Sequence, residues 1–503
     1  MHCDEAVHAD KFGVLLENGR YEYSTVDFHG PTLNYLTLVP ALLQGARHYK
    51  DINEVTLRCV PAFFGVLLVA AHALLVPYIG LPAALCAALL AALSPAMVYY
   101  DRYYIHETLL VFFSFGALLS ILEYLSSRRP VWAVGAGTCL GLMYSTKETS
   151  VIVFFCMLAA MGLALALDEQ RSDVLQSLRT PGLGRHLRMA ILAAVLVSLL
   201  LYSSFLSHPR GILDSVAAFR TYFQRGTGSQ TWHVHPWFYY LKLLSYFRSH
   251  QGPVWSEGLI LFLAVLGFRA GLRRNGVAGA NPMLLRYLCF YTLLMTVIYS
   301  AIPYKAPWNL LGFLHGMVLL AGIGAAWLLN VLRKSAVRLT VTALLLAGLA
   351  HLGWEAWAAS FRYGADPRNP YVYAHTGEDV FLIVRELEGL ALVHPDRYAM
   401  PIQIISEENL WPLPWYLRRF TGVLWWNGVF DDVPNAPVIL ATPDMEPDLE
   451  RKFYELPPPG KREMYMNMFR RRVELRPQVE LRGYVVKWLW DEYQQAQEQG
   501  AMK

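Results

Sequence analysis

Apolar residues form long, nearly uninterrupted runs across the first 358 positions of the chain. Most of these runs are long enough for an α-helix to cross a hydrocarbon core about 30 Å thick. A surface helix of a soluble protein keeps a polar face, which these runs lack. The pattern predicts ten membrane-spanning helices, at about 60–78, 81–99, 108–126, 131–146, 149–167, 187–206, 256–272, 284–302, 310–332 and 337–358.

Arginine and lysine gather in every second short loop between these segments. They are Arg128 and Arg129, then Arg171, Arg179, Arg185 and Arg188, then Arg269, Arg273 and Arg274, and finally Arg333, Lys334 and Arg338. Such loops mark the cytoplasmic side. The other loops are then expected outside: 1–59, 100–107, 147–148, 207–255, 303–309 and everything after 359. This predicts an integral protein of the plasma (inner) membrane, with its outer loops and C-terminal domain extracytoplasmic.

The two ends of the chain differ from the apolar middle. Residues 1–59 are polar and form the first outer loop of a transmembrane domain that we place at 1–358. A polar segment does not cross a membrane alone, so we expect a helix upstream of Met1 and eleven spans in a full-length protein. Residues 359–503 have ordinary charge density. Strands at 401–406 and 437–442 and helices at 378–390 and 448–454 predict a small α/β domain there.

Composition agrees with the membrane class. Of 503 residues 55% are hydrophobic and 16% are charged, against about 25% charged in soluble domains. The net charge of +4 gives no indication of a nucleic-acid partner. The six cysteines form no CxxC pair, so we expect buried thiols and no disulfide framework.

Candidate chemistry lies in the outer loops. Asp4 and Glu5, followed by His8, stand at a predicted helix start. Two neighbouring carboxylates disfavour each other's ionisation, which suits a general base. The alternative is a solvated helix cap.

The second outer loop holds Asp101, Arg102, His106 and Glu107 among four tyrosines. Ionisable groups at a membrane boundary are costly unless they are paired or used. The alternative is an interfacial aromatic belt in which Asp101 pairs with Arg102.

Two further loops carry lysine. Lys147 and Glu148 form a tight turn between two apolar helices, where lysine could hold a phosphate headgroup or merely snorkel. The loop with Tyr304, Lys305, Trp308 and Asn309 is held extended by two prolines. Its tryptophan could stack on a sugar or belong to the aromatic belt.

Histidines complete the set. His29 precedes Gly30–Pro31, and His233 and His235 lie in a later aromatic stretch. The later pair could bind a divalent metal with Asp4 or Glu107, or be ordinary interfacial residues. No cofactor is certain. Two acidic clusters and two lysines on one outer face would suit a lipid phosphate.

These residues resemble those of a known superfamily. The Asp-Glu pair in the first loop, arginine followed by an acid in the second, and Thr-Lys in a helical turn are similar to GT-C glycosyltransferases. Within that superfamily the pattern resembles glycosyltransferase family 39, the protein O-mannosyltransferases and aminoarabinose transferases. The motifs DEAVHA, FHGP, TKET and IPYKxPWN resemble the flippase-activity-associated family most closely, over essentially the whole chain.

The resemblance implies roles for individual residues. Asp4 matches the carboxylate that activates the acceptor, and Glu5 is its partner. Arg102 and Glu107 match the arginine and second acid of the second loop, and Lys147 the lysine after the short helix. Glu148 departs from the pattern, because relatives often have glycine there.

The implied activity is transfer of a sugar from a polyprenyl-phosphate donor to an acceptor hydroxyl on a glycan or protein, with inversion at the anomeric carbon. Membrane lipid is the other expected partner. The alternative is a protein that binds or flips lipid-linked sugars without catalysis. Transporters place charges near the bilayer midplane, whereas here they lie at helix ends, which favours an enzyme.

Overall fold

A computed structural model describes residues 1–26, 29–168, 182–226, 233–249, 251–273, 277 and 279–500. The chain divides into two compact units. The helical unit comprises Lys11–Arg47 and Ile52–Tyr373, and the C-terminal unit comprises Met1–Asp10, His48–Asp51 and Ala374–Lys503. The division falls within the first helix, α1 (Cys3–Asn18). Each unit is described on its own.

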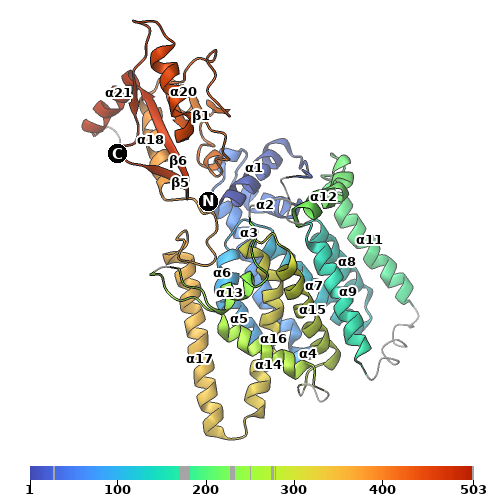
Figure 1. The fold of residues 1–503 in the computed structure, drawn as a ribbon. Helices are drawn as coiled ribbons and strands as arrows, with labels where there is room; N and C mark the ends of the chain where they lie inside the picture. Colours follow the sequence, from blue (N-terminus) through green and yellow to red (C-terminus); the bar gives the residue numbers. More distant parts are fainter. Residues whose placement is uncertain are drawn as a thin grey trace. The chain divides into compact units, whose positions relative to one another are not determined.

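The helical unit consists of helices joined by short turns (Figure 1). The helices after α1 are α2 (Thr32–Leu43), α3 (Glu54–Ala71), η2 (His72–Leu75), α4 (Val76–Ile79), α5 (Leu81–Leu93), α6 (Pro95–Tyr100), α7 (Glu107–Ser127), α8 (Pro130–Tyr144), α9 (Ser150–Ala166), α11 (Leu183–Tyr202), α12 (Arg210–Gly226), α13 (Tyr239–Ser245), α14 (Gly258–Gly271), α15 (Pro282–Ala301), η3 (Pro307–Leu310), α16 (Leu311–Val331), α17 (Ser335–Trp357) and η4 (Ala358–Arg362).

All ten predicted segments are helical, but they differ in length. Among the described residues, six helical stretches are long and apolar enough to cross a membrane: Glu54–Ile79, Glu107–Ser127, Leu183–Tyr202, Pro282–Ala301, Pro307–Val331 and Ser335–Arg362. The other four segments form the shorter apolar helices α5, α8, α9 and α14. The count of ten spans and the sidedness of the loops stay predictions. Arg171, Arg179 and Arg274 lie outside the described residues.

The predicted helix 81–99 is interrupted, and the reason is local. Ser94 has extended backbone angles because Pro95 follows it, and a residue before proline avoids the α-helical region. The Ser94 side chain then accepts a hydrogen bond from the backbone N–H of Met97 and caps α6. One predicted span is therefore two helices, α5 and α6.

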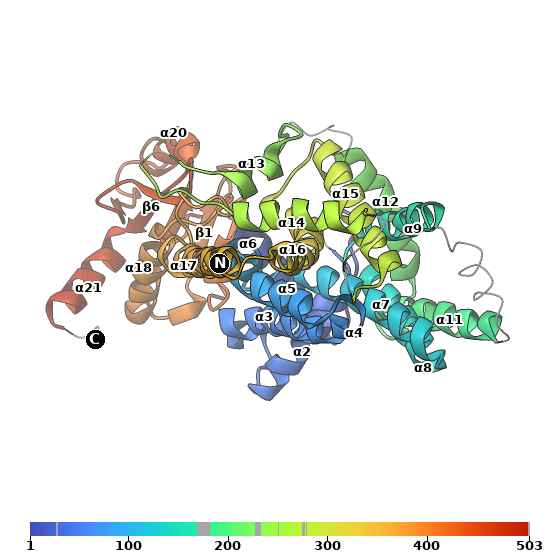
Figure 2. The ribbon, with the colours of Figure 1, turned by 90° about the horizontal axis from the view of Figure 1, so that it is seen from below.

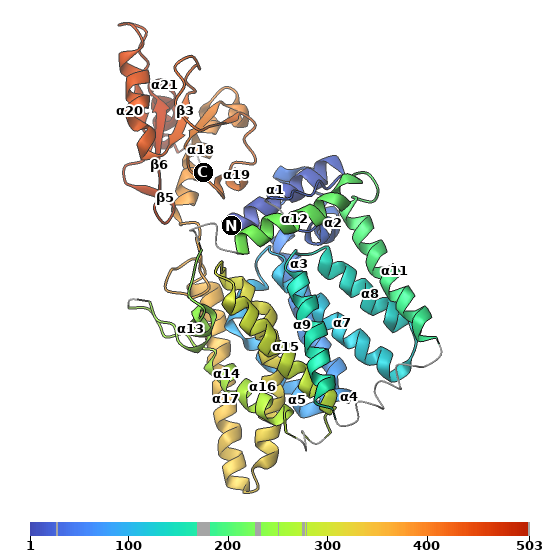
Figure 3. The ribbon, with the colours of Figure 1, turned by 45° about the vertical axis from the view of Figure 1, so that its right-hand side comes forward.

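Glycines let the helices of this unit approach closely. A Cβ added at Gly267 of α14 would lie 1.8 Å from the Leu320 carbonyl oxygen of α16, and one at Gly324 would lie 2.0 Å from the Leu263 oxygen. Without a hydrophobic driving force between helices in lipid, such backbone contacts provide the packing. Figure 2 shows α16 between α14 and α5, and Figure 3 shows α8 between α7 and α11.

The C-terminal unit contains a six-stranded sheet with helices packed against it. The strands are β1 (Ile402–Ile405), β2 (Val423–Trp426), β3 (Val438–Ala441), β4 (Tyr465–Asn467), β5 (Val473–Arg476) and β6 (Val479–Val486). The order is β2-β1-β3-β6-β4, with β5 also paired to β6. The pairs β1–β2 and β1–β3 are parallel and those with β6 are antiparallel. The remaining elements are η1 (Tyr49–Asp51), α18 (Asp379–Val393), η5 (Arg397–Ala399), α19 (Leu413–Tyr416), η6 (Pro443–Met445), α20 (Glu446–Glu450), η7 (Arg451–Glu455) and α21 (Lys487–Glu498).

The predicted small α/β domain is confirmed. Both predicted strands are present as β1 and β3, and both predicted helices as α18 and as α20 continued by η7. Every residue of β1 and β3 is buried. Strands covered on both faces read as continuous apolar runs, which is why the sequence revealed these two.

The division between the units differs from the predicted boundary at 358/359. Residues up to Tyr373 cluster with the helical unit. The Tyr371 hydroxyl donates to Glu257 (2.8 Å), and the Trp255 indole donates to the Arg368 carbonyl (2.8 Å). The predicted first outer loop is also divided, because Met1–Asp10 groups with the C-terminal unit, where Thr376 donates to the Met1 carbonyl (2.6 Å). All six cysteines are free thiols.

Candidate active site

The predicted residues fall into both units. Asp4, Glu5 and His8 belong to the part of α1 that groups with the C-terminal unit. As predicted, Asp4 and Glu5 stand in the first turn of a helix. Glu5 is fully buried and accepts a hydrogen bond from the backbone N–H of His2 (2.9 Å), whereas Asp4 is partly exposed. The other predicted residues belong to the helical unit.

Three predicted residues of the helical unit meet at one point. The Lys147 ammonium forms an ion pair with Glu107, and the Asn309 side-chain oxygen lies 3.5 Å from the same nitrogen. Glu107 begins α7, Lys147 precedes α9 and Asn309 lies in η3, so three helix beginnings converge here. Both charged residues are buried, with 5% of Lys147 and 6% of Glu107 exposed. Charges this far from water persist only when paired.

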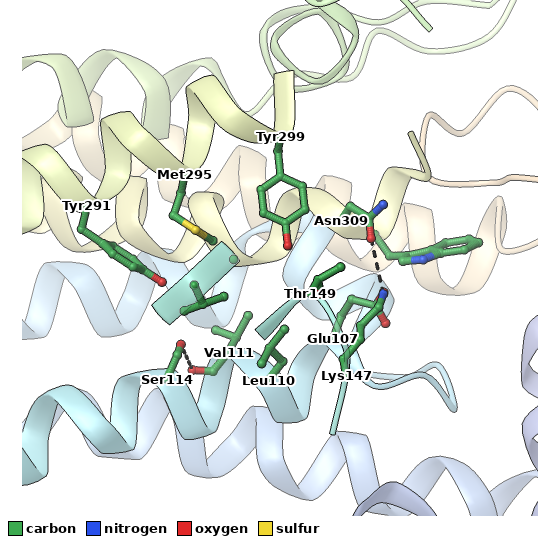
Figure 4. A pocket seen from close by; sticks show the side chains of 13 residues that line it. Glu107, Leu110, Val111, Ser114, Lys147, Thr149, Tyr291, Met295, Tyr299 and Asn309 are labelled. Carbon is green, nitrogen blue, oxygen red and sulfur yellow. Dashed lines mark hydrogen bonds and ion pairs between the residues drawn. The ribbon is translucent and has the colours of Figure 1, made fainter. Parts of the chain in front are cut away.

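A pocket extends from this ion pair between α7, α9, α15 and α16. It holds about 340 Å³ of space unoccupied by atoms, including solvent at its mouth. Figure 4 shows Glu107, Lys147 and Asn309 at one end and Tyr291 with Ser114 towards the other. Its walls are Glu107, Leu110, Val111, Ser114, Lys147, Thr149, Val153, Tyr291, Met295, Tyr299, Trp308, Asn309 and Gly312. Tyr291 and Tyr299 are eight residues apart on α15, which corresponds to roughly 12 Å along the helix. The site is a charged head followed by a largely apolar groove.

Glu148 points to different partners from those of Lys147. Its carboxylate accepts a hydrogen bond from the Tyr23 hydroxyl (2.6 Å) and pairs with His29 Nδ1 (2.7 Å). The Tyr222 hydroxyl lies 3.1 Å from the same histidine nitrogen. Burial pushes the pKa of Glu148 up, but the interactions with His29 and the hydrogen bond from Tyr23 outweigh this effect, so the pKa of this carboxyl lies below its ordinary value. Glu148 is therefore a buried acid whose partners differ from those of Lys147.

Gly30 explains how His29 reaches that position. A Cβ at Gly30 would lie 2.1 Å from the Ser145 carbonyl oxygen. Thr32 donates to the same oxygen through its backbone N–H (3.1 Å) and its hydroxyl (2.7 Å). The turn at 29–32 thus docks directly on the turn that carries Lys147 and Glu148.

The remaining residues of the second loop are individually held. The Thr108 hydroxyl donates to Asp101 (2.8 Å), and Asp101 packs against Gly65 of α3. Burial raises the pKa of Asp101 to about 7. Arg102 donates to the Ser360 carbonyl (2.9 Å) and lies 4.5 Å from the Phe361 ring.

His106 lies beside His29. Its Nε2 is 3.2 Å from the Gly30 carbonyl oxygen, and its ring centroid is 5.1 Å from that of His29. His106 is fully buried. The histidine therefore connects the start of α7 to the docked turn.

Lys305 has a different environment from the predicted one. Only 1% of it is exposed, and its ammonium donates to the backbone carbonyls of Ile302 and His235. Loss of hydration lowers the pKa of Lys305. It does not line the pocket described above. Its contacts fix the chain at 233–235, where Val234 and Tyr304 also form a β-bridge.

The aromatic and histidine residues near this loop pack on one another. Trp308 lines the pocket and lies 5.8 Å from the Tyr373 ring. His233 contacts the rings of Tyr304 (5.4 Å) and Tyr373 (5.2 Å), and His235 stacks on Tyr239 (4.2 Å). Among the described residues, no group of three or more His, Cys, Asp and Glu is placed to hold a metal ion. Phe28 and Trp232, which belong to two of the sequence motifs, lie outside the described residues.

Several pocket residues were not predicted: Ser114, Thr149, Tyr291, Met295 and Tyr299. They lie in or next to apolar helices, where the sequence pattern predicts a membrane span and does not distinguish pocket residues from other buried residues. A signal does exist on α15, where Tyr287, Tyr291, Met295 and Tyr299 recur every four residues and so share one helix face. Polar aromatic residues on one face of an apolar helix indicate a lined cavity.

The fold is similar to those of two solved transferases, ArnT and an archaeal oligosaccharyltransferase. The chain superposes on ArnT from Cupriavidus metallidurans bound to undecaprenyl phosphate with a TM-score of 0.60 and 14% identity, over 97% of this chain and 94% of that one. It superposes on the Archaeoglobus fulgidus oligosaccharyltransferase with a TM-score of 0.54 and 14% identity, over 88% of this chain. The match spans 65% of the length of that oligosaccharyltransferase.

The sequence comparison agrees. Residues 34–210 match the family model described as dolichyl-phosphate-mannose-protein mannosyltransferase. No curated protein sequence matches the chain. The predicted resemblance to GT-C glycosyltransferases is confirmed. The narrower resemblance to the flippase-activity-associated family stays a prediction.

Gly30→Ala tests the docking of the 29–32 turn. The added methyl group would overlap the Ser145 carbonyl oxygen, so we expect a loss of about 1–3 kcal/mol in unfolding free energy, typical of overpacking. Thermal unfolding in detergent measures it. Gly162→Ala is the matched control, because nothing lies within 4 Å of its added Cβ. Equal stability of the two variants would contradict the docking.

Asp101→Asn tests the raised pKa of that carboxyl. A raised pKa lowers stability as pH rises from the unfolded value towards about 7. Because asparagine can still accept from Thr108, the variant should gain stability over the wild type at about pH 8 and less at about pH 5. Melting temperatures at both values provide the measurement.

Asp366→Asn is the control with the opposite sign. The hydrogen bond from Arg368 lowers the pKa of Asp366, so its replacement should show no gain at the higher pH. An Asp101→Asn variant that gains nothing between the two values would show that the carboxyl is well hydrated.

Proposed function

We propose that this protein transfers a sugar from a polyprenyl-phosphate donor to an acceptor hydroxyl at the outer face of the plasma membrane, with inversion of configuration. The observation that carries the proposal is Lys147, held by Glu107 at the head of a mostly apolar groove. The charge of Lys147 suits an anionic headgroup, and the apolar side chains of Leu110, Val111, Val153 and Met295 suit contact with an isoprenoid chain.

The sugar transfer needs few catalytic groups besides the lysine that holds the phosphate. The acceptor oxygen attacks the anomeric carbon while the bond from that carbon to the phosphate oxygen breaks, and the bonding electrons leave on the phosphate. Phosphate is a good leaving group, so no strong general acid is needed, unlike in a glycosidase. Lys147 stabilises the developing phosphate charge. Asp4, supported by Glu5, takes the acceptor proton, and Glu107 holds Lys147 and helps orient the acceptor.

Similar proteins support this assignment of substrate class. The ArnT structure contains undecaprenyl phosphate, and a further oligosaccharyltransferase structure contains dolichol phosphate with an inhibitory peptide. The matching family model is described by a lipid-phosphate mannose donor and a protein acceptor. We assign the same two partners to this chain, a lipid-linked sugar and an acceptor that is a glycan or a protein.

The other predicted cations are given secondary roles. Lys305 is engaged with backbone carbonyls and shapes the loop before η3 rather than meeting the phosphate. Arg102 donates to the Ser360 carbonyl and so holds η4, which follows α17. We therefore assign the phosphate to Lys147.

Lys147→Met should reduce transfer by about 10²-fold or more, because a charge that stabilises the transition state is lost. Lys147→Arg keeps the positive charge and should retain part of the transfer activity. The measurement is transfer of labelled sugar from a polyprenyl-phosphate donor by purified protein in liposomes. Lys487→Met, which removes an exposed lysine of α21, is the control. Movement of the donor across the bilayer without transfer would instead establish a flippase and overturn the proposal.

Asp4→Asn should abolish transfer while leaving thermal unfolding unchanged, since a general base contributes about 10²–10⁴-fold and the side chain is partly exposed. Glu17→Gln, an exposed residue of the same helix, should behave as the wild type. Turnover retained by Asp4→Asn would remove Asp4 from the mechanism.

A further inference from the structure

Helix α12 exposes a row of apolar side chains, which we call the α12 row: Leu213, Val216 and Phe223. Each of them is between 63% and 75% exposed. Their spacings of three and seven residues place them on one face of the helix. Arg210 and Arg220 are exposed on the same face. Exposed apolar side chains accompanied by arginine are typical of a helix that lies in a membrane surface.

The opposite face of α12 is packed against the helical unit. Ala218 is fully buried, and the Phe219 ring lies 6.1 Å from the ring of Tyr144. Asp214 stands between the two faces, with 21% of its side chain exposed. Its carboxylate lies 3.8 Å from Arg210, whose side chain stays 81% exposed. The packing therefore turns the α12 row away from the other helices.

Helix α12 crosses the ends of two apolar helices. A Cβ at Gly211 would lie 2.1 Å from the carbonyl oxygen of Tyr202, the last residue of α11. Ser215 and Phe219 contact Tyr144, the last residue of α8. Figure 3 shows α12 crossing the upper end of α11. Because α11 has 20 residues, about the length that crosses a hydrocarbon core, its end and α12 lie near the boundary between lipid and water.

The turn between α11 and α12 has an unusual backbone. Ser204, Phe205 and Leu206 have φ angles of 50°, 53° and 70°, a region that is unfavourable for residues other than glycine. The Ser204 hydroxyl holds the turn, because it accepts from the Tyr21 backbone N–H (2.9 Å) and lies 2.6 Å from the Tyr35 hydroxyl. Phe205 and Leu206 are 58% and 69% exposed. A strained turn that presents two apolar side chains indicates a function for them.

Lipid is the occupant that suits this surface. Ile191 and Val195 of α11 are exposed, as expected of a membrane span that faces lipid, and the apolar surface continues through the turn at 204–206 to the α12 row. Arginine can lay its stem along apolar surface and bring its charge to a phosphate. We infer that α12 and this turn form an interfacial anchor on the phospholipid bilayer, with Arg210 and Arg220 on anionic headgroups. The anchor does not depend on the proposed sugar transfer.

The test uses the full chain in nanodiscs of equimolar phosphatidylglycerol and phosphatidylcholine. Leu213→p-benzoylphenylalanine places a photoreactive ketone in the α12 row, and mass spectrometry identifies what it cross-links. We expect a yield of phospholipid adducts within about threefold of that from the same substitution at Leu196, an exposed residue of α11.

Leu392 of α18 is the matched control, because it is as exposed as Leu196 but shares its helix face with the exposed residues Arg385 and Glu388. The same substitution there should give at least about tenfold fewer adducts, since a charged face stays in water.

The arginines should determine the headgroup preference. A basic residue near a membrane surface favours anionic lipid by about fivefold. Adducts at Leu213 should therefore favour phosphatidylglycerol by at least about fivefold, and by less than about twofold when Arg210→Gln and Arg220→Gln are combined. Arg385→Gln combined with Arg419→Gln, which removes two exposed arginines of the C-terminal unit, should leave the preference unchanged.

Thermal unfolding establishes that each variant is folded. Folded protein that gives no more phospholipid adducts at Leu213 than at Leu392 overturns the anchor, and so does a cross-link from Leu213 to a second copy of the chain. Adducts without a headgroup preference, or a preference that survives the loss of both arginines, overturn the assignment of Arg210 and Arg220 to anionic headgroups.

Discussion

The ion pair between Lys147 and Glu107 is the constraint around which the helical unit is arranged. It joins the beginnings of α7 and α9, and Asn309 adds the segment leading into α16. Taking two charges out of water is expensive, and a buried ion pair often adds nothing to stability compared with apolar side chains. Its presence at one end of a pocket is better explained by a ligand than by folding.

Helix packing decides where the pocket can be. Glycines bring α14, α16 and α5 into backbone contact, and Gly137 and Gly141 do the same between α8 and α11. The face of α15 that meets α7 and α9 carries Tyr291, Met295 and Tyr299 instead. These larger side chains line the pocket, which lies beside the ion pair. Close packing elsewhere gives the pocket rigid walls.

The sequence singled out individual residues of the pocket but did not indicate their partners. A charged side chain next to an apolar helix is energetically costly, so such residues are usually functional. On this ground the sequence singles out Lys147, Glu107 and Glu148. Their pairing was not predictable, since Lys147 meets a residue 40 positions away while its neighbour Glu148 turns to His29, 119 positions away. Lys305 looked equivalent to Lys147 by the same rule, yet backbone carbonyls satisfy it.

The sequence predicted most of the apolar helices but not every boundary between elements. The apolar runs predicted the ten long apolar segments, because a helix that lies in lipid is apolar over its whole length. They did not predict α2 and α12, which lie in the expected outer loops. They did not give the break at Ser94, which is a local backbone effect, or the unit boundary, which depends on hydrogen bonds of Tyr371 with distant residues. In the C-terminal unit only the two strands buried on both faces were visible in the sequence.

The polarity of the pocket supports the proposed ligand class. A soluble sugar phosphate would need polar groups along its whole length. Beyond Lys147, Glu107 and Asn309, the walls are leucine, valine, methionine, tryptophan and glycine, with hydroxyl groups from Ser114, Thr149, Tyr291 and Tyr299. Contact with apolar walls favours an apolar ligand. A cation at one end of the pocket would determine which end of the ligand binds there. Because Glu107 already neutralises that cation, an anionic headgroup must compete with a carboxylate for it. A ligand that can do so has its negative charge fixed at the end of a hydrophobic chain, as a lipid-linked phosphate does.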